Sequence, residues 1–250
     1  MNLTDFFHEN PRAAIAFSGG VDSAYLLYAA MQAGADVTAY YVKTAFQPEF
    51  EYRDALRMAQ LLHAPIRVLE PDVLCHSEVT DNPPDRCYYC KRVLFSLILE
   101  RAGEDGYSLV LDGTNASDDV SDRPGMRALK EMCVRSPLRE AGLTKDRIRQ
   151  LSKEADLFTW DKPSYACLAT RIRSGDPITA HKLAITEQAE KDLADLGFRD
   201  FRVRYRNGGA RIQVKREQMP LVIACADQIR QRLGQNYSDI CLDLEARNGQ

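Results

Sequence analysis

Residues 13–34, AAIAFSGGVDSAYLLYAAMQAG, contain the feature that decides the fold: an apolar run, a Gly-Gly turn and a helical pattern. Ala13–Phe17 is typical of a buried strand, and Val21–Ala33 has apolar residues at helical spacing up to a stop at Gly34. Further strands are expected at 37–42, 65–69 and 109–111, and further helices at 52–63 and 91–102. Strands that alternate with helices indicate an α/β fold with a doubly wound parallel sheet.

The pattern changes after about residue 175. We expect, in order, a long helix, a two-stranded hairpin, another helix and a last strand at Thr179–Leu196, Phe201–Tyr205 with Ala210–Lys215, Met219–Leu233 and Asp239–Leu242. The sequence therefore predicts a first domain of residues 1–174, which holds the doubly wound sheet, and a small α+β domain of residues 175–250.

Composition excludes several classes of protein. The chain has 250 residues, of which 45% are hydrophobic and 28% charged, and its formal net charge is −3. This charge argues against a strong general attraction to nucleic acid or anionic membranes. No apolar run is long enough for a membrane span, and the N-terminus lacks the pattern of a secretory signal. The seven cysteines are therefore expected to be reduced thiols of a cytoplasmic protein.

The Gly-Gly turn, Ser18-Gly19-Gly20-Val21-Asp22-Ser23, is a candidate phosphate loop. Paired glycines let backbone amides approach phosphate oxygens, and the N-terminus of the following helix attracts the same anions. Ser18 and Ser23 add hydroxyl donors, and Asp22 can hold a Mg²⁺ ion that bridges phosphates. The alternative is an ordinary strand-to-helix turn, which the full six-residue pattern makes the less favoured interpretation.

The loop lacks the lysine of the Walker pattern. It resembles instead the pyrophosphatase loop of the ATP-splitting family that includes GMP synthetase, NAD synthetase, argininosuccinate synthetase and several tRNA thiolases. This resemblance implies cleavage of ATP between the α and β phosphates and attachment of AMP to an oxygen of the substrate. Asp112-Gly113-Thr114-Asn115 follows a later strand, so we expect Gly113, Thr114 and Asn115 to face the same pocket as ATP contacts.

Cys87 and Cys90 form a Cys-x-x-Cys pair, close enough to bind one metal, bind one cluster or form one disulfide. A single such pair is a modest signal, so a reducible pair and chance spacing stay open. No second pair exists, which excludes a four-cysteine zinc ribbon. Arg86 and Lys91 flank the pair and would lower the pKa of both thiols if their charges lie near.

Cys167 lies in a segment, residues 160–171, that has no convincing amphipathic period and is therefore predicted to be a loop. Arg171 and Arg173 are close in sequence, and a thiol among cations is a candidate thiolate nucleophile. The other cysteines lie in or beside apolar pieces, and we expect most of these four to be buried: Cys75, Cys133, Cys225 and Cys241.

Five segments in this order resemble the LarE family and span nearly the whole predicted first domain: Ser18–Ser23, Arg86–Lys91, Asp112–Asn115, Ser136–Leu138 and Trp160–Arg171. The resemblance implies thiolation of the carboxylates of pyridinium-3,5-biscarboxylic acid mononucleotide, a precursor of the nickel-pincer nucleotide of lactate racemase. ATP adenylates a carboxylate, and the enzyme then delivers sulfur in place of oxygen. The resemblance also implies ATP and Mg²⁺ as cofactors, Asp22 and Cys167 as catalytic residues, and a homo-oligomer.

The family resemblance implies two sulfur sources. In one subgroup the residue that matches Cys167 gives up its own sulfur and becomes dehydroalanine. In another subgroup three cysteines hold a [4Fe-4S] cluster that carries an extra sulfide. This chain has Cys87, Cys90 and Cys167, so we expect the cluster, with the sacrificial use of Cys167 as the alternative.

Arginines alternate along the predicted hairpin. With a two-residue turn at Gly208-Gly209, the expected pairs on one face are Arg206 with Arg211, Arg204 with Gln213 and Arg202 with Lys215. Like charges opposite each other destabilise a hairpin, so an anion should compensate, and arginine suits phosphate. The pattern alone favours a solvated outer face equally. The resemblance favours Arg202 and Arg204 as ligands of the substrate phosphate and Arg171 as a further substrate ligand, with a tRNA backbone as the rival anion.

Two other functions stay open. A tRNA thiolase of the same superfamily would bind RNA strongly and in a salt-sensitive way, against which the acidic composition argues. A nucleotide- or Fe–S-sensing module without turnover would bind ATP and release no pyrophosphate. The expected partners are therefore the mononucleotide and further copies of this chain, without a membrane and with nucleic acid disfavoured.

Overall fold

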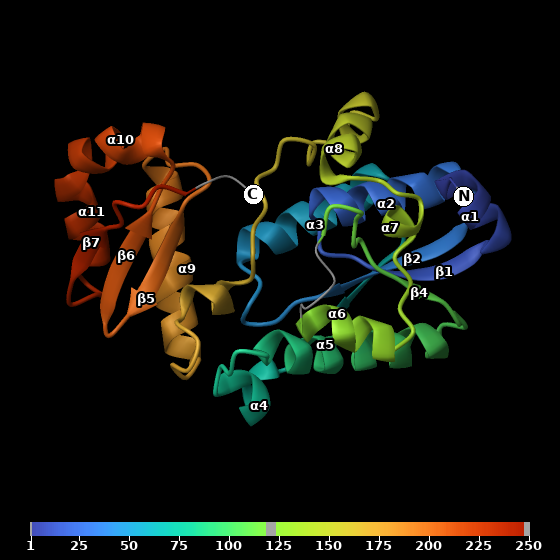
Figure 1. Ribbon diagram of the computed structural model, residues 1–250, viewed down its shortest axis with the longest axis horizontal. Coiled ribbons are helices and arrows are strands. Elements are labelled where there is room, and N and C mark those ends of the chain that lie inside the picture. The colour runs from blue at the N-terminus through green and yellow to red at the C-terminus, as the bar shows by residue number, and fades with distance from the viewer. Residues whose placement is uncertain (1, 119–123, 248–250) are drawn as a thin grey trace. The chain divides into compact units, whose positions relative to one another are not determined.

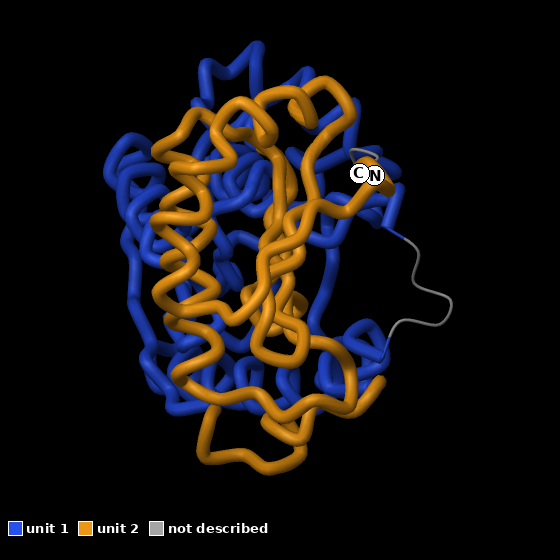
Figure 2. Tube along the Cα trace, turned by 90° about the vertical axis from the view of Figure 1, so that its left-hand side faces the viewer, with its two compact units in different colours: residues 1–73, 85–162 blue, residues 74–84, 163–250 orange. Residues whose placement is uncertain are grey.

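The computed structural model describes residues 2–118 and 124–247. The chain forms two compact units, one of residues 1–73 with 85–162 and one of residues 74–84 with 163–250 (Figure 2). Cys167 and Arg171 thus belong to the same unit as the predicted hairpin. The domains expected at 1–174 and 175–250 stay a prediction.

The first unit contains a four-stranded parallel sheet with the strand order β3-β2-β1-β4 (Figure 1). Its strands are β1 (Arg12–Ala16), β2 (Asp36–Val42), β3 (Ile66–Leu69) and β4 (Val110–Leu111). Its helices are α1 (Leu3–Glu9), α2 (Val21–Gln32), α3 (Glu49–Leu61), α5 (Arg86–Glu104), α6 (Pro124–Glu131), α7 (Pro137–Glu140) and α8 (Lys145–Glu154). Parallel pairing of β1 with both β2 and β4 confirms the α/β class and the parallel sheet.

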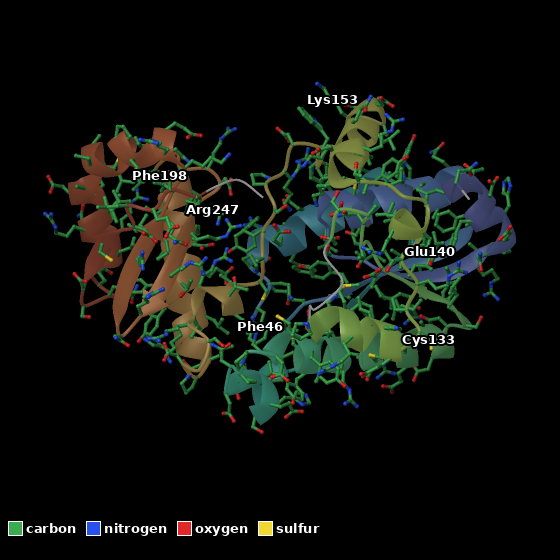
Figure 3. All side chains as sticks on the ribbon, viewed as in Figure 1. Phe46, Cys133, Glu140, Lys153, Phe198 and Arg247 are labelled. Atoms are coloured by element: carbon green, nitrogen blue, oxygen red, sulfur yellow. The ribbon has the colours of Figure 1, made fainter. Side chains whose placement is uncertain are left out.

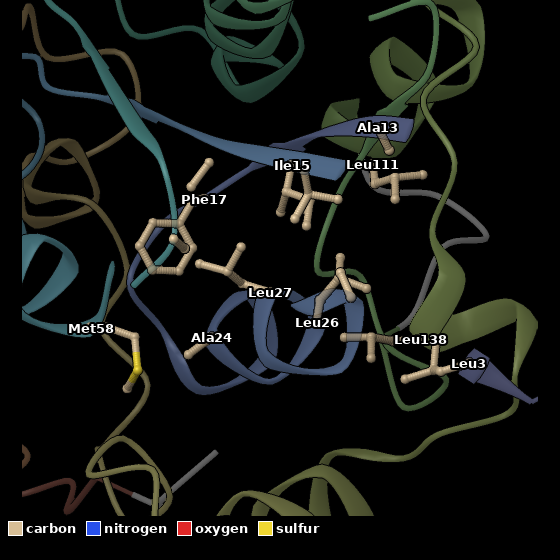
Figure 4. Close-up of a cluster of buried hydrophobic side chains, with 14 of the residues drawn as sticks. Leu3, Ala13, Ile15, Phe17, Ala24, Leu26, Leu27, Met58, Leu111 and Leu138 are labelled. Carbon is tan, nitrogen blue, oxygen red and sulfur yellow. The ribbon is translucent and has the colours of Figure 1, made fainter. Parts of the chain in front are cut away.

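Helices cover both faces of this sheet. Successive residues of a strand point to opposite faces, so β1 takes part in two cores. Ile15 packs in the core built with α1 and α2, where Leu26 and Leu27 are fully buried (Figure 4). Ala14 packs in the core built with α5 and α6, together with Phe95. This burial on both sides explains why the strands of the sheet are predominantly apolar.

The second unit contains a three-stranded sheet with the order β5-β6-β7. The strands are β5 (Arg202–Arg206), β6 (Gly209–Gln213) and β7 (Ile240–Leu242), and the helices are α4 (Ser77–Thr80), α9 (Ala180–Asp195), α10 (Met219–Ala224) and α11 (Ala226–Leu233). Helix α9 begins after the expected N-cap, Thr179, whose hydroxyl accepts the backbone N–H of Lys182 at 3.2 Å. Its apolar residues pack on the sheet.

The predicted hairpin register is wrong by two residues. The turn is Asn207-Gly208, with φ values of 49° and 83°, and Gly209 is already part of β6. Positive φ at both central positions is what a tight hairpin turn needs, and Asn-Gly supplies it at low cost. Arg204 therefore lies opposite Arg211, and the remaining pairs shift with it to Arg202 with Gln213 and Arg206 with Gly209.

Two predicted helices have different bounds in the structure. The helix expected from residue 91 begins at Arg86, so Cys87 and Cys90 lie inside α5 and not in the loop before it. The helix expected at 219–233 is interrupted at Cys225, whose φ of −97° and ψ of 12° are not α-helical. None of the described helices is long and apolar enough to cross a membrane.

The expectation of buried cysteines outside the site is also wrong. Cys75, Cys133 and Cys241 are exposed and Cys225 is half-buried. Cys133, labelled in Figure 3, follows the end of α6 with a φ of 55°, and Cys241 lies on the edge strand β7. Apolar neighbours in sequence did not imply burial because these residues lie where an element ends or faces solvent.

Candidate active site

Two loops lie at the carboxyl ends of β1 and β4. These strands are neighbours, with Ile15 opposite Leu111. Strands β2 and β3 lie on one side of β1 and β4 lies on its other side, so the direction in which strands are added to the sheet reverses here. Ligands of open parallel sheets bind beyond the carboxyl ends of strands at such a point. The loop at 18–23 follows β1 and the loop at 112–115 follows β4, so the topology brings both predicted ATP loops to it.

The loop after β1 allows close approach of an anion. Gly19 has a φ of +74°, and a Cβ atom there would lie 2.8 Å from the Cβ atom of Ala55, so only glycine fits. The hydroxyl of Ser23 accepts the backbone N–H of Ser18 at 3.2 Å and lies 3.1 Å from its hydroxyl. Gly20 is the N-cap of α2 and provides no side-chain hydrogen bond to the helix, so the backbone N–H groups of the first helical turn can donate to a bound anion.

The loop after β4 packs directly on the first loop. A Cβ atom at Gly113 would lie 2.9 Å from the backbone nitrogen of Ser23. The hydroxyl of Thr114 donates to Asp112 at 2.5 Å, and the hydroxyl of Ser136 donates to the same carboxylate at 2.6 Å. These bonds hold the second loop in shape and tie it to Ser136, which explains why Ser136 belongs to the pattern seen in the sequence.

We expect Gly113→Ala to weaken ATP binding at least about tenfold, because the added methyl would displace the backbone of the phosphate loop and overpacking costs about 1–3 kcal/mol. Isothermal titration with ATP measures the effect. Gly103→Ala is the matched control, since no heavy atom lies within 4 Å of a Cβ atom there. An unchanged dissociation constant for Gly113→Ala would contradict the assignment of this loop to the ATP site.

Asp22, the predicted Mg²⁺ ligand, contacts residues from two other elements. The side-chain amide of Asn115 donates to Oδ1 at 3.3 Å, and the ammonium of Lys145 donates to Oδ2 in a salt bridge. The side chains of Asp22 and Lys145 keep 19% and 28% of their exposure, so solvent reaches the pair. The predicted phosphate site thus has a lysine close by that the six-residue loop lacks. Sequence reasoning missed Lys145, because only its place after the N-cap Thr144 marks it locally.

Cys87 and Cys90 lie on one face of the first turns of α5, since they are three positions apart along the helix. Cys87 is exposed and Cys90 half-buried. Arg86 lies near as expected, with Nη2 3.6 Å from the sulfur of Cys87. Burial lowers the pKa of Lys91, while the carboxylate of Asp112 acts in the opposite direction. The first unit therefore brings two thiols and a half-buried ammonium to one end of α5.

The spacing of Cys87 and Cys90 would let both thiols bind the same metal ion or cluster. Cys167, the expected third ligand, belongs to the other compact unit. Among residues 2–118 and 124–247, no three His, Cys, Asp or Glu side chains form a group able to hold a metal ion. The three-cysteine cluster therefore stays a prediction.

Cys167 is half-buried and precedes a short 3₁₀ helix, Leu168–Arg171, which agrees with the expected irregular segment. The side chain of Arg171 is 1% exposed and forms a two-bond ion pair with Glu190. The N–H groups of the Arg171 guanidinium thus donate to acceptors of the protein itself. The role of Arg171 as a substrate ligand stays a prediction that this geometry does not favour.

Arg202 and Arg204 lie in a region of concentrated positive charge. Burial, followed by the charges of Arg171 and Arg247, lowers the pKa of Arg202 to about 10. Burial and the same two cations lower the pKa of Arg204. Asp200 offsets part of this charge, with a carboxylate oxygen 3.8 Å from Arg202 and 3.0 Å from Arg247, which is labelled in Figure 3. Cations that depress each other's pKa favour an additional anion.

No family model matches the chain. It is 38% identical over 222 residues to an uncharacterised protein of Synechocystis, a match that covers 87% of this chain and 82% of the relative. It is 33% identical over 238 residues to the pyridinium-3,5-bisthiocarboxylic acid mononucleotide synthase of Lactiplantibacillus plantarum. That match covers 93% of this chain and 86% of the relative. The tRNA-specific 2-thiouridylase MnmA of Pseudothermotoga lettingae matches at 26% identity over 187 residues, which cover 60% of this chain and 54% of that protein.

Three features define an ATP-binding protein of the PP-loop class: the parallel sheet, the contact between the two glycine loops, and Asp22 of the first loop bonded to Asn115 of the second. The match to the mononucleotide synthase is more specific because it extends over nearly the whole chain. The chain belongs to the LarE family, as the sequence motifs indicated.

Proposed function

We propose that this protein is an ATP-dependent sulfurtransferase that converts carboxylates of pyridinium-3,5-biscarboxylic acid mononucleotide to thiocarboxylates. A carboxylate oxygen attacks the α-phosphorus of ATP, the bond to the bridging oxygen breaks, and pyrophosphate leaves. A sulfur nucleophile then attacks the acyl carbon, and AMP leaves with the carboxylate oxygen. The proposal rests on the contact between the loops at 18–23 and 112–115, with Asp22 bonded to Asn115 and Lys145.

The roles in the first step follow from charge. The backbone of residues 18–23 and the N-terminus of α2 bind phosphate oxygens, and Gly113, Thr114 and Asn115 complete the site. Asp22 would hold Mg²⁺, which when bound neutralises phosphate charge. Lys145 can exchange its bond to Asp22 for one to the departing pyrophosphate. Such prearranged charge supplies the main stabilisation of the leaving group.

Substrate binding is the role proposed for the second unit. Arg202 and Arg204 bind the phosphate of the mononucleotide. Their positive charges repel those of Arg171 and Arg247, and a bound anion offsets this repulsion. We further propose a doubly wound first domain of residues 1–174, a second domain of residues 175–250, a homo-oligomer and a cytoplasmic location.

The sulfur is proposed to come from Cys167 with Cys87 and Cys90, either as sulfide carried by a cluster or from Cys167 itself. For the protein purified without oxygen we expect about four iron atoms and a similar amount of acid-labile sulfide per chain. Cys87→Ser should abolish both, and the exposed Cys133→Ser should keep both. A preparation that reconstitutes no iron, and whose Cys167 is converted to dehydroalanine after one turnover with its sulfur in the product, would contradict the cluster and establish the sacrificial route.

A tRNA thiolase is the second candidate, because tRNA 2-thiouridylases match part of this chain at 24–32% identity. This function predicts tRNA binding that weakens steeply with salt. Pyrophosphate release stimulated by tRNA and not by the pyridinium mononucleotide would favour it over the first proposal.

A further inference from the structure

Arg171 binds the backbone of the segment that carries Cys167. Its Nη1 donates to the carbonyl oxygen of Ala166 at 2.8 Å and of Cys167 at 3.4 Å, and to the hydroxyl of Thr170 at 2.9 Å. Only 1% of the Arg171 side chain is exposed, so these bonds are shielded from water. We refer to residues 164–170 as the cysteine segment.

Two arginines of β5 bind the same segment near its ends. Arg202 donates to the carbonyl oxygen of Ser164 at 2.6 Å, and Arg204 donates to that of Thr170 at 2.9 Å. A guanidinium has five N–H donors, so Arg202 and Arg204 can hold the segment and still bind a phosphate. Apart from the start of the 3₁₀ helix, the cysteine segment has no regular structure, and four of its backbone carbonyls accept hydrogen bonds from these arginine side chains.

Glu190 of α9 holds this arrangement in place. Its carboxylate accepts Nε and Nη2 of Arg171 at 2.8 and 3.1 Å and the backbone N–H of Val203 at 3.0 Å. It also accepts the hydroxyl of Tyr165, whose ring centre lies 4.4 Å from Arg171 Cζ and 5.0 Å from Arg202 Cζ. A buried carboxylate with these partners orients the guanidinium of Arg171 strongly.

We infer that Arg171, oriented by Glu190, is a positioning residue that holds the cysteine segment, with Arg202 and Arg204 fixing its two ends. The inference rests on the proposed function only in that Cys167 supplies or binds the sulfur. Arg171 acts on the reaction through the backbone of Cys167 and does not contact the mononucleotide. It therefore affects turnover in sulfur transfer and not affinity for the substrate.

The test replaces Arg171 by Lys in the full-length protein, which keeps the charge and removes the planar fork. We expect amide hydrogen exchange in residues 164–170 to accelerate at least about tenfold, including the Thr170 N–H that now donates to the Cys167 carbonyl at 3.0 Å. We expect kcat for thiocarboxylate formation to fall at least about tenfold with KM for the mononucleotide unchanged. The exposed Arg206→Lys is the matched control from the same strand and should change none of these quantities.

Unchanged exchange in the cysteine segment would overturn the inference. So would a raised KM with unchanged kcat, because that result would make Arg171 a substrate ligand. Exchange is measured without ATP and mononucleotide, so the inference about the segment can hold even if the proposed reaction is wrong. Failure of the proposed function would appear instead as absent product from the unsubstituted protein.

A lysine cannot reproduce the two-bond pairing with the buried carboxylate of Glu190, and weakening a buried ion pair can unfold a protein, so a second variant is needed. Arg171→Gln combined with Glu190→Gln removes both charges and keeps groups that can hydrogen-bond to each other. If this double variant folds, the same local acceleration of exchange in residues 164–170 is expected. Exchange in the segment equal to that of the unsubstituted protein would overturn the inference in this case too.

Discussion

Asp22→Asn is expected to reduce the rate of pyrophosphate release by roughly 10²–10³-fold, the loss seen when one prearranged stabilising group is removed from a reacting centre. The amide has nearly the shape of the carboxylate but no charge, so it binds Mg²⁺ poorly and cannot pair with Lys145. A coupled assay of pyrophosphate with ATP and the mononucleotide measures the rate, and thermal unfolding checks that the fold is intact.

Asp146→Asn is the matched control for this prediction, because Asp146 is an exposed carboxylate in the first turn of α8, next to Lys145. It should leave pyrophosphate release unchanged. Lys145→Met tests the other partner of Asp22 and should lower the rate less than the loss of the carboxylate, since it removes only one of several phosphate contacts. An Asp22→Asn variant with normal pyrophosphate release would remove Asp22 from the catalytic site.

Cys167→Ser is expected to lower thiocarboxylate formation by at least about 10³-fold, because a serine hydroxyl is neither a thiolate nor a ligand for soft metals. Adenylation precedes sulfur delivery, so one pyrophosphate per chain should still be released in a rapid burst. Quenched-flow measurement of pyrophosphate and mass spectrometry of the mononucleotide separate the two steps.

Cys225→Ser is the control for Cys167, since Cys225 is another half-buried cysteine of the second unit and is expected to be without effect. A Cys167→Ser variant that still forms product over many turnovers would contradict both proposed sulfur sources. A variant that loses the burst as well would show that Cys167 also serves in adenylation, contrary to the order of steps proposed above.

The sequence by itself determined the local features of this protein. A strand, a Gly-Gly turn and a helix within 22 consecutive residues predicted β1, the loop after it and α2, because backbone φ angles and helix caps depend mainly on neighbouring residues. The N-cap Thr179 and the alternation of strands and helices were predictable for the same reason. Family motifs in the correct order then indicated the LarE family, which the similarity to a mononucleotide synthase confirms.

Only the tertiary structure decided which distant groups meet. Lys145 reaches Asp22 across 123 residues, and no local pattern marks that pairing. The hairpin register depended on whether Asn207 or Gly209 completes the turn. In the structure Asn207 does. Gly209 lies in β6 and pairs with Arg206, and a Cβ atom there would lie 3.2 Å from the Asp239 carbonyl oxygen. Arg171 appeared in the sequence as a cation available to a substrate, whereas folding buries it against Glu190 and the backbone of Cys167. Such contacts depend on how separate elements pack, and a buried charge takes the partners that packing brings to it.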